Sequence, residues 1–273
     1  MDDNLELNDQ QFQRIRDILR NGYGISMGVE KRTLVFSRLR PLLRQKGFGD
    51  FDAYLKYLAE DKTGEATSVF INRLTTNHTY FMREPEHMEL LAKRALPWIE
   101  ENFGKTKDLR LWCAACSSGE EAYTLQMVVS DYFENKPGWN LEILATDISE
   151  RVLQQAYAGI YSNESLKALP SDWLSKYFKR YDDENMIARD EIKRLITFRR
   201  YNLNETKMPF KKPFQVIFCR NVMIYFDNTT REALVTRMYD ALEKDGFFFV
   251  GHSESLSNIR SDFEFIRPAA YRK

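Results

Sequence analysis

The sequence has few cysteines, few histidines and no long hydrophobic run. Its 273 residues include three cysteines and three histidines, and its densest apolar stretch is FFFV at 247–250. A transmembrane helix needs about 20 consecutive apolar residues, so we expect no membrane insertion. The N-terminal segment MDDNLELNDQ is acidic and lacks the basic and then apolar pattern of a secretory signal. These absences predict a soluble, cytoplasmic protein.

An excess of charge of either sign is also missing. The chain holds 40 basic and 40 acidic residues, which gives a formal net charge of zero. Global charge therefore offers no reason to expect a nucleic acid or an anionic membrane as partner. The length is sufficient for a sizeable core and for one large or two small domains.

The cysteines and histidines do not form a pattern typical of a metal site. Cys113 and Cys116 form a C-x-x-C motif, but no second pair or nearby histidine completes a zinc signature. A redox dithiol is an alternative, although the spacing alone favours small buried residues at a strand end. His78, His87 and His252 are scattered along the chain and predict no metal triad.

The hydrophobic pattern changes along the chain from helical to alternating strand and helix. Residues 1–72 are expected to be helical, 73–90 to form a linker, and 91–273 to form a second domain. Its expected strands are 109–114, 141–147, 195–201, 214–219 and 246–252, and its expected helices are 120–133, 149–157 and 229–243. Near-continuous apolar strands separated by helices predict an α/β fold with a doubly wound, mostly parallel sheet. The tail 263–273 is expected to add an antiparallel edge strand, and 175–197 to form a small inserted antiparallel hairpin.

Small residues follow the first expected strand, in the stretch CAACSSGEEAYTL. Ligands bind at the carboxyl ends of the strands in an open parallel sheet. A dinucleotide requires a G-x-G-x-x-G turn for its pyrophosphate, but this loop has one glycine and is followed by Glu120 and Glu121. The sulfonium and ammonium groups of S-adenosylmethionine are cationic, so these two acids favour that cofactor. They could instead be ordinary first-turn acids that interact with the helix dipole.

Polar residues also stand at the ends of two other expected strands. Asp147 ends the second strand, where a carboxylate can accept both ribose hydroxyls of a nucleoside, or can cap the next helix. Arg220 and Asn221 interrupt an apolar run after the fourth strand, where buried polar groups require partners. A ligand-binding role and a buried, satisfied pair both fit them.

Several stretches together resemble the chemotaxis receptor methyltransferases of the CheR type. They are LTTNHTYFMREPEHM, CAACSSGEEAYTL, ATDISERVLQQAYAGIYS, FCRNVMIYFD and LEKDGFFFVGHSESL, and they occur in the family's order. The resemblance implies a small helical N-terminal domain and an S-adenosylmethionine-dependent methyltransferase domain that releases S-adenosylhomocysteine. It also implies methyl transfer to glutamate side chains on the cytoplasmic helices of methyl-accepting chemotaxis receptors.

The resemblance further implies a set of site residues. Glu121, rather than Glu120, would hold the cationic amino-acid end of the cofactor, and Asp147 the ribose. Asn202 and Leu203 would flank the adenine. Arg83 and Tyr225 would orient the substrate carboxylate as catalytic residues. The remaining cofactor contacts would be Asn77, Thr79, Arg83, Arg220 and Asn221.

A basic segment precedes these motifs, KRTLVFSRLRPLLRQK at residues 31–46. Val35, Leu39 and Leu42 share one face of the expected helix, away from Arg38, Arg40 and Arg44. Such charges are often only a solvated face, but the implied acidic receptor makes these arginines candidates for docking. Pro41 is expected to kink or split the helix. The inserted segment lacks the glycine-rich turn with which some relatives bind a receptor's C-terminal tethering pentapeptide, so we expect no need for that tether.

Three other functions remain open from the residues. The chain could methylate a carboxylate on a molecule other than a chemoreceptor, or could bind adenosylmethionine or adenosylhomocysteine as a non-catalytic signalling module. A nicotinamide oxidoreductase is disfavoured by the single-glycine loop and the paired glutamates.

Overall fold

The computed structural model describes residues 5–75 and 78–273, and the chain divides into two compact units. One unit comprises residues 1–77 with 225–230, and the other comprises 78–224 with 231–273. No helix in the described part of the chain is long and apolar enough to cross a membrane.

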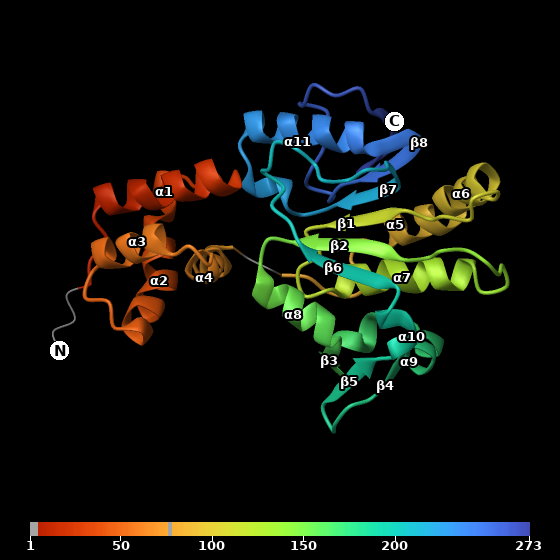
Figure 1. Cartoon of the computed structure of the whole chain (residues 1–273), viewed down its shortest axis with the longest axis horizontal. Coiled ribbons are helices and arrows are strands. Elements are labelled where there is room, and N and C mark those ends of the chain that lie inside the picture. Colours follow the sequence, from red (N-terminus) through yellow and green to blue (C-terminus); the bar gives the residue numbers. More distant parts are fainter. Residues whose placement is uncertain (1–4, 76–77) are drawn as a thin grey trace. The chain divides into compact units, whose positions relative to one another are not determined.

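The first unit is built from helices, as expected. Its elements are α1 (Asp9–Tyr23), η1 (Val29–Lys31), α2 (Arg32–Lys46), α3 (Phe51–Glu60) and α4 (Glu65–Leu74) (Figure 1). Helix α1 begins at a capping box, in which Asn8 and Gln11 each accept the other's backbone N–H, and it ends at left-handed Gly24.

Helix α2 corrects one expectation, because it runs through Pro41 and is not split there. Pro41 removes the backbone hydrogen bond to Ser37, but both residues lie on the exposed side, where water can satisfy the freed carbonyl. The expected apolar face is confirmed, since Val35, Leu39 and Leu42 are all buried.

The second unit contains the predicted doubly wound, mostly parallel sheet, with strand order β6-β2-β1-β7-β8-β10-β9 (Figure 1). The parallel strands are β1 (Leu111–Ala114), β2 (Ile143–Asp147), β6 (Ile196–Arg200), β7 (Phe214–Cys219) and β8 (Leu242–Phe249). The tail forms two antiparallel strands rather than one, β9 (Glu264–Arg267) and β10 (Ala270–Arg272). Because β1 lies between β2 and β7, the loops after these three strands meet at one edge of the sheet.

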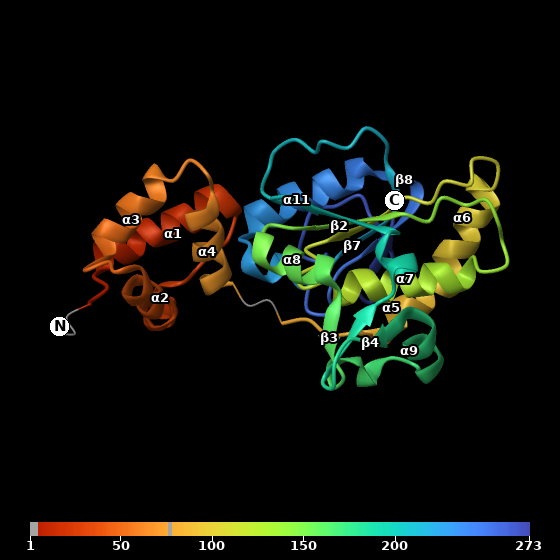
Figure 2. The same ribbon diagram turned by 60° about the horizontal axis from the view of Figure 1, so that its bottom comes forward.

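Helices cover both faces of this sheet. The core on one face joins β1, β2, β7 and β8 to buried side chains of α5 (Pro85–Leu90), η2 (Leu91–Ala95), α6 (Leu96–Phe103) and α7 (Glu120–Tyr132). Helix α8 (Glu150–Ala158) follows β2. Helix α11 (Asn228–Ala241) lies on the face of the sheet opposite to α7 (Figure 2). The short η4 (Met223–Tyr225) precedes α11.

The expected hairpin is present and gains a third strand. β4 (Phe178–Arg180) and β5 (Asn185–Ala188) pair antiparallel, and β3 (Ile160–Ser162) joins the other edge of β5. This strand lies outside the predicted segment 175–197, because α8 ends at left-handed Gly159 and the chain extends directly into β3. η3 (Ser165–Ala168), α9 (Ser171–Tyr177) and α10 (Asp190–Lys193) complete the insertion.

Candidate functional site

The loop after β1 has an unusual backbone. Ala115, Ser117 and Gly119 all have positive φ, at 66°, 49° and 100°. A Cβ atom at Gly119 would lie 2.8 Å from both the Ala156 Cβ and the Tyr161 hydroxyl, so only glycine fits there. Such strained backbone conformations are concentrated at ligand-binding and catalytic sites.

Asp147 joins this loop to the next strand. One carboxylate oxygen accepts the Ser117 backbone N–H and the other accepts that of Ser149, both at 2.9 Å. The side chain that caps α8 is Ser149, whose hydroxyl accepts the Val152 N–H. Burial raises the pKa of Asp147. Each oxygen keeps a further lone pair, so the buried carboxylate can still accept hydrogen bonds from a diol.

The two glutamates at the start of α7 have different partners. The Glu121 carboxylate accepts a hydrogen bond from the Arg220 guanidinium at 2.7 Å and another from the Cys113 thiol at 3.3 Å. The Glu120 carboxylate accepts the Ser118 hydroxyl at 2.8 Å, and no lysine or arginine of the described residues forms an ion pair with it. Burial raises the pKa of Glu120. Its negative charge is therefore the less compensated of the two.

Arg220 is the centre of a buried ionic network at the end of β7. Its side chain is 1% exposed and lies 2.7 Å from Glu121 and 2.9 Å from Glu84. It also donates to the backbone carbonyl of Arg83 at 2.7 Å. Arg220 thereby ties the segment before α5 to the start of α7.

Asn221 has φ of 59°. Its backbone N–H donates to a buried acid, Glu254, that sequence reasoning missed. The Glu254 carboxylate accepts the backbone N–H groups of Asn221, Gly251 and Ile224 at 2.6, 2.7 and 3.2 Å. Burial raises its pKa. The only signal in the sequence was an acid within HSES, directly after an expected strand, so Glu254 could have been considered there.

The segment before α5 contributes Thr79 and Arg83, both half-buried. Arg83 donates to the His78 carbonyl at 3.0 Å, and its guanidinium lies 5.6 Å from the centre of the Tyr80 ring. Met82 and Glu84, its neighbours, both have positive φ. Asn77 lies outside the described residues, so its predicted role stays a prediction.

Asn202 and Leu203 follow β6, beside the end of β2. The Tyr201 N–H donates to the Asp147 carbonyl at 3.0 Å, which holds this loop next to Asp147. Leu203 is buried, and its carbonyl accepts a hydrogen bond from Arg237 at 2.8 Å. The loop thus begins beside the end of β2 and carries a buried apolar side chain, Leu203.

The remaining predicted residues belong to the first unit. Tyr225 ends η4, and its carbonyl accepts the Ser26 N–H at 2.7 Å. Arg38 is half-buried and donates to the Leu74 carbonyl at 2.7 Å, at the end of α4. Arg40 lies over the Phe36 ring, and Arg44 is exposed. The catalytic role of Tyr225 and the docking role of the arginines stay predictions.

The cysteines form no disulfide. Cys113, Cys116 and Cys219 are buried free thiols, and burial raises their pKa well above the ordinary value. A thiol with a raised pKa is a poor nucleophile. The interpretation of Cys113 and Cys116 as small buried residues at a strand end therefore fits better than a redox dithiol.

The chemistry of this edge suits a cationic nucleoside. Asp147 provides a buried diol acceptor, the loop of 115–119 lies close to it, and the less compensated carboxylate, Glu120, stands at the start of α7. A pyrophosphate would meet two glutamates at the helix N-terminus, whereas a sulfonium and an ammonium group would be attracted to them.

Comparison with known proteins agrees with this chemistry. A family model described as "CheR methyltransferase, all-alpha domain" matches residues 10–75, and one described as "CheR methyltransferase, SAM binding domain" matches residues 77–271.

Two curated relatives are similar over almost their whole length. The chain is 38% identical to the chemotaxis protein methyltransferase of Borreliella burgdorferi, over 99% of this chain and 96% of the relative. It is 38% identical to that of Escherichia coli, over 96% of this chain and 90% of the relative. The chain therefore belongs to the CheR family of methyltransferases, whose cofactor is S-adenosylmethionine.

Proposed function

We propose that this protein methylates glutamate side chains on the cytoplasmic helices of methyl-accepting chemotaxis receptors. The product is a glutamate methyl ester, and the second product is S-adenosylhomocysteine. The observation that carries the proposal is the buried acidic edge at Asp147 and Glu120, in a chain similar over nearly its full length to chemotaxis protein methyltransferases.

The cofactor's functional groups correspond to residues at this edge. Asp147 would accept the ribose hydroxyls, and Leu203 with Asn202 would flank the adenine. Thr79, Arg83, Asn221 and, outside the described residues, Asn77 would make further contacts.

The two glutamates differ in how well each could hold the amino-acid end of the cofactor. Glu121 was the predicted contact, but its charge is already compensated by Arg220. The geometry favours Glu120, whose carboxylate is buried without a cationic partner among the described residues. Arg220 then acts by positioning Glu121 and the segment around Arg83.

The reaction needs little from the protein beyond orientation. A glutamate carboxyl has an ordinary pKa of about 4.3 and is an anion at neutral pH, so no general base is required. Bound S-adenosylmethionine supplies an activated methyl group. A carboxylate oxygen forms the new bond to the methyl carbon as the bond from that carbon to sulfur breaks. Arg83 and Tyr225 would hold the carboxylate in line by hydrogen bonds and charge, and exclude water from the reacting atoms.

The receptor would dock through Arg38, Arg40 and Arg44 on α2. Arg44 is exposed on α2, and Arg38 is half-buried and donates to the Leu74 carbonyl at the end of α4. The β4–β5 turn contains no glycine, and Asp182 closes it by accepting the Asn185 N–H at 2.7 Å. We therefore propose that a C-terminal tethering pentapeptide is not needed.

The test uses cofactor labelled on its methyl group and receptor cytoplasmic fragments from the source organism. Label released as methanol by mild alkali, and lost with Arg83→Ala, is the expected result for a carboxyl methyl ester. Alkali-stable label would contradict ester formation. Cofactor binding without any label on receptors would favour another carboxylate substrate or a non-catalytic binding module.

A further inference from the structure

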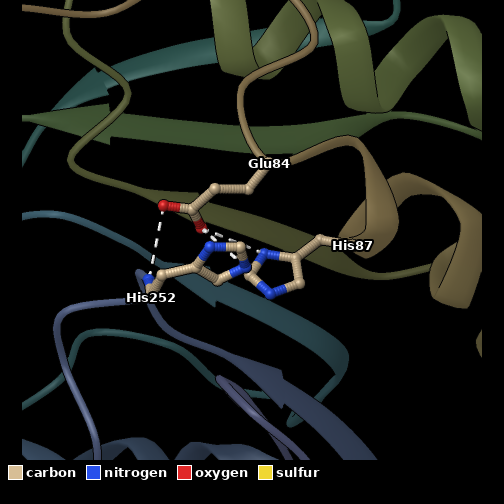
Figure 3. A group of neighbouring side chains, drawn as sticks. All are labelled: Glu84, His87 and His252. Carbon is tan, nitrogen blue, oxygen red and sulfur yellow. Dashed lines mark hydrogen bonds and ion pairs between the residues drawn. The ribbon is translucent and has the colours of Figure 1, made fainter.

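Two histidines that are far apart in the sequence lie together in the second unit. His87 on α5 and His252 in the loop after β8 have ring centres 5.1 Å apart, and Glu84 completes the group (Figure 3). The fold brings together these two histidines, which are scattered in the sequence, whereas His78 is exposed and outside this group. The fold places these two histidines next to each other, because β8 ends beside the segment that leads into α5.

The His87 ring has unmet polar groups. Its side chain is completely buried, and neither ring nitrogen has a hydrogen-bond partner among residues 5–75 and 78–273. Figure 3 shows the ring directed toward Glu84 and His252, and its Nδ1 atom lies 3.4 Å from a Glu84 carboxylate oxygen. A buried imidazole without a partner costs free energy, and a bound metal ion would satisfy it.

The donor atoms are close to the spacing that a metal ion requires. One donor atom from each of Glu84, His87 and His252 lies within 4.8 Å of the others. The His252 Nε2 atom is 4.0 Å from Glu84 and 2.6 Å from a carboxylate oxygen of Glu86. Ligand bonds of about 2.0–2.1 Å in a tetrahedron place donor atoms roughly 3.3 Å apart, so small side-chain rotations suffice.

The local charge also permits a cation. Glu84, Glu86 and Glu121 are carboxylates, and Arg220 is the basic residue that contacts two of them. The group therefore keeps an excess of two negative charges, equal to the charge of a divalent ion. Two imidazoles with carboxylates are ligands that zinc and similar borderline metals prefer over calcium or magnesium.

We propose that Glu84, His87 and His252 form a binding site for a divalent transition metal of the zinc class, with Glu86 as the fourth ligand. The site is separate from the acidic edge that binds the cofactor, but it shares Glu84 with Arg220, which in turn holds Glu121. A metal ion on Glu84 weakens the Glu84–Arg220 ion pair and adds positive charge near a site for a cationic cofactor. Metal and S-adenosylmethionine therefore bind antagonistically.

The first test measures metal binding directly, without activity as the readout. The full-length protein is freed of metal with a chelator and titrated with Zn²⁺ by calorimetry and with Co²⁺ by visible absorption. We expect one ion per chain and cobalt bands typical of nitrogen and oxygen ligands. His252→Ala, at a half-exposed side chain, should weaken Zn²⁺ binding by at least about 100-fold, since even outer-shell partners contribute 10- to 100-fold. His78→Ala is the matched control and should bind like the wild type.

Several outcomes would overturn the proposal. They are an absence of stoichiometric binding, equal binding by wild type and His252→Ala, and a thiolate-to-cobalt charge-transfer band, which would assign the ion to the cysteines. If His252→Ala fails to fold, Glu86→Gln replaces it, with an expected loss of about 10-fold or more.

The antagonism between metal and cofactor is tested by measuring the affinity for each in the presence of the other. The dissociation constant of S-adenosylmethionine should rise with Zn²⁺, and by linkage that of Zn²⁺ should rise by the same factor with the cofactor. Unchanged cofactor affinity at saturating Zn²⁺ would refute the coupling.

Discussion

At the residue scale, the arrangement of charge around the site depends on one buried guanidinium. Arg220 lies between Glu84 and Glu121 and is almost completely buried. Desolvation opposes its charge, but the two carboxylates outweigh this and raise its pKa. The pairing fixes Glu121 and leaves Glu120 as the carboxylate with the less compensated charge, so one arginine determines which acid can meet a cation.

Replacing Arg220 should therefore destabilise the protein. Arg220→Ala leaves two buried carboxylates without their partner, and we expect the free energy of unfolding to fall by about 3–5 kcal/mol. Urea denaturation followed by circular dichroism measures this change. Arg151→Ala, at an exposed arginine on α8, should change stability by no more than about 0.5 kcal/mol. Equal effects of the two variants would mean that the network is not stabilising.

The roles of Glu120 and Glu121 can be distinguished by replacing each with glutamine. Glu120→Gln should weaken S-adenosylmethionine binding by about 10- to 100-fold, the equivalent of one charge-assisted hydrogen bond. Glu121→Gln should weaken it less and should mainly lower stability, because it disturbs Arg220. Calorimetric titration of both variants decides the assignment. A larger loss of affinity in Glu121→Gln would support the original prediction of Glu121.

Cofactor binding should depend on pH in a defined direction. Burial raises the pKa of both Glu120 and Asp147, so these carboxyls become protonated at higher pH than ordinary ones. Protonation removes the negative charge that attracts the cofactor. The dissociation constant of S-adenosylmethionine should therefore increase as pH falls through the raised pKa values of these two carboxyls. Affinity that is constant down to pH 4.5 would contradict this expectation.

At the element scale, the candidate site is lined by the loops after β1 and β7 and by the segment before α5, and all three have residues with positive φ. Of the described non-glycine residues with positive φ, five of eight lie in three such segments, namely Met82, Glu84, Ala115, Ser117 and Asn221. This concentration indicates that the surrounding strands and helices hold these loops in place and compensate for the strain.

Substitution of Gly119 tests the role of the loop between β1 and α7. Gly119→Ala places a Cβ against Ala156 and Tyr161 at a positive φ, and should cost about 1–3 kcal/mol of stability. It should also weaken cofactor binding, because Ser117 and Asp147 are joined through this loop. Gly22→Ala is the control, since its added Cβ would meet no described atom within 4 Å beyond its chain neighbours and its own helix backbone, and in helix α1 it should stabilise by about 0.5–1 kcal/mol. Thermal unfolding with and without cofactor measures both effects.

At the scale of the whole molecule, the two units have different proposed tasks. The sheet unit holds the acidic edge for the cofactor, and the helical unit carries the basic residues of α2. Under this proposal, a change in α2 should alter recognition of the receptor without altering the cofactor site.

A charge reversal in the helical unit should separate these tasks. Arg44→Glu replaces an exposed positive charge, so the KM for an acidic receptor fragment should rise several-fold, and less so at high salt. The affinity for S-adenosylmethionine should stay unchanged. Initial rates at varied receptor and salt concentrations measure the first effect, and calorimetry measures the second. An unchanged KM would exclude Arg44 from docking.

Much of the architecture follows from local pattern. The strand at 214–219 was predicted with its correct ends, because a run that is apolar except for Gln215 is bounded by Pro213 and Arg220. The expected split of α2 at Pro41 was wrong, since the sequence does not show that Pro41 and Ser37 both face solvent. The strand β3 was missed, because three residues are too short for a periodic signal and exist only by pairing with β5.

The sequence by itself determined the family, the fold class and the presence of acids at strand ends, because hydrophobic periodicity and motif order are local properties of the chain. Only the tertiary structure decided how those acids are paired. The compensation of Glu121 by Arg220, the support of Asn221 by Glu254 and the meeting of His87 with His252 join residues separated by 99, 33 and 165 positions. Such contacts depend on which strands are neighbours and on which side chains lose their water, and both are set by the packing of the whole sheet.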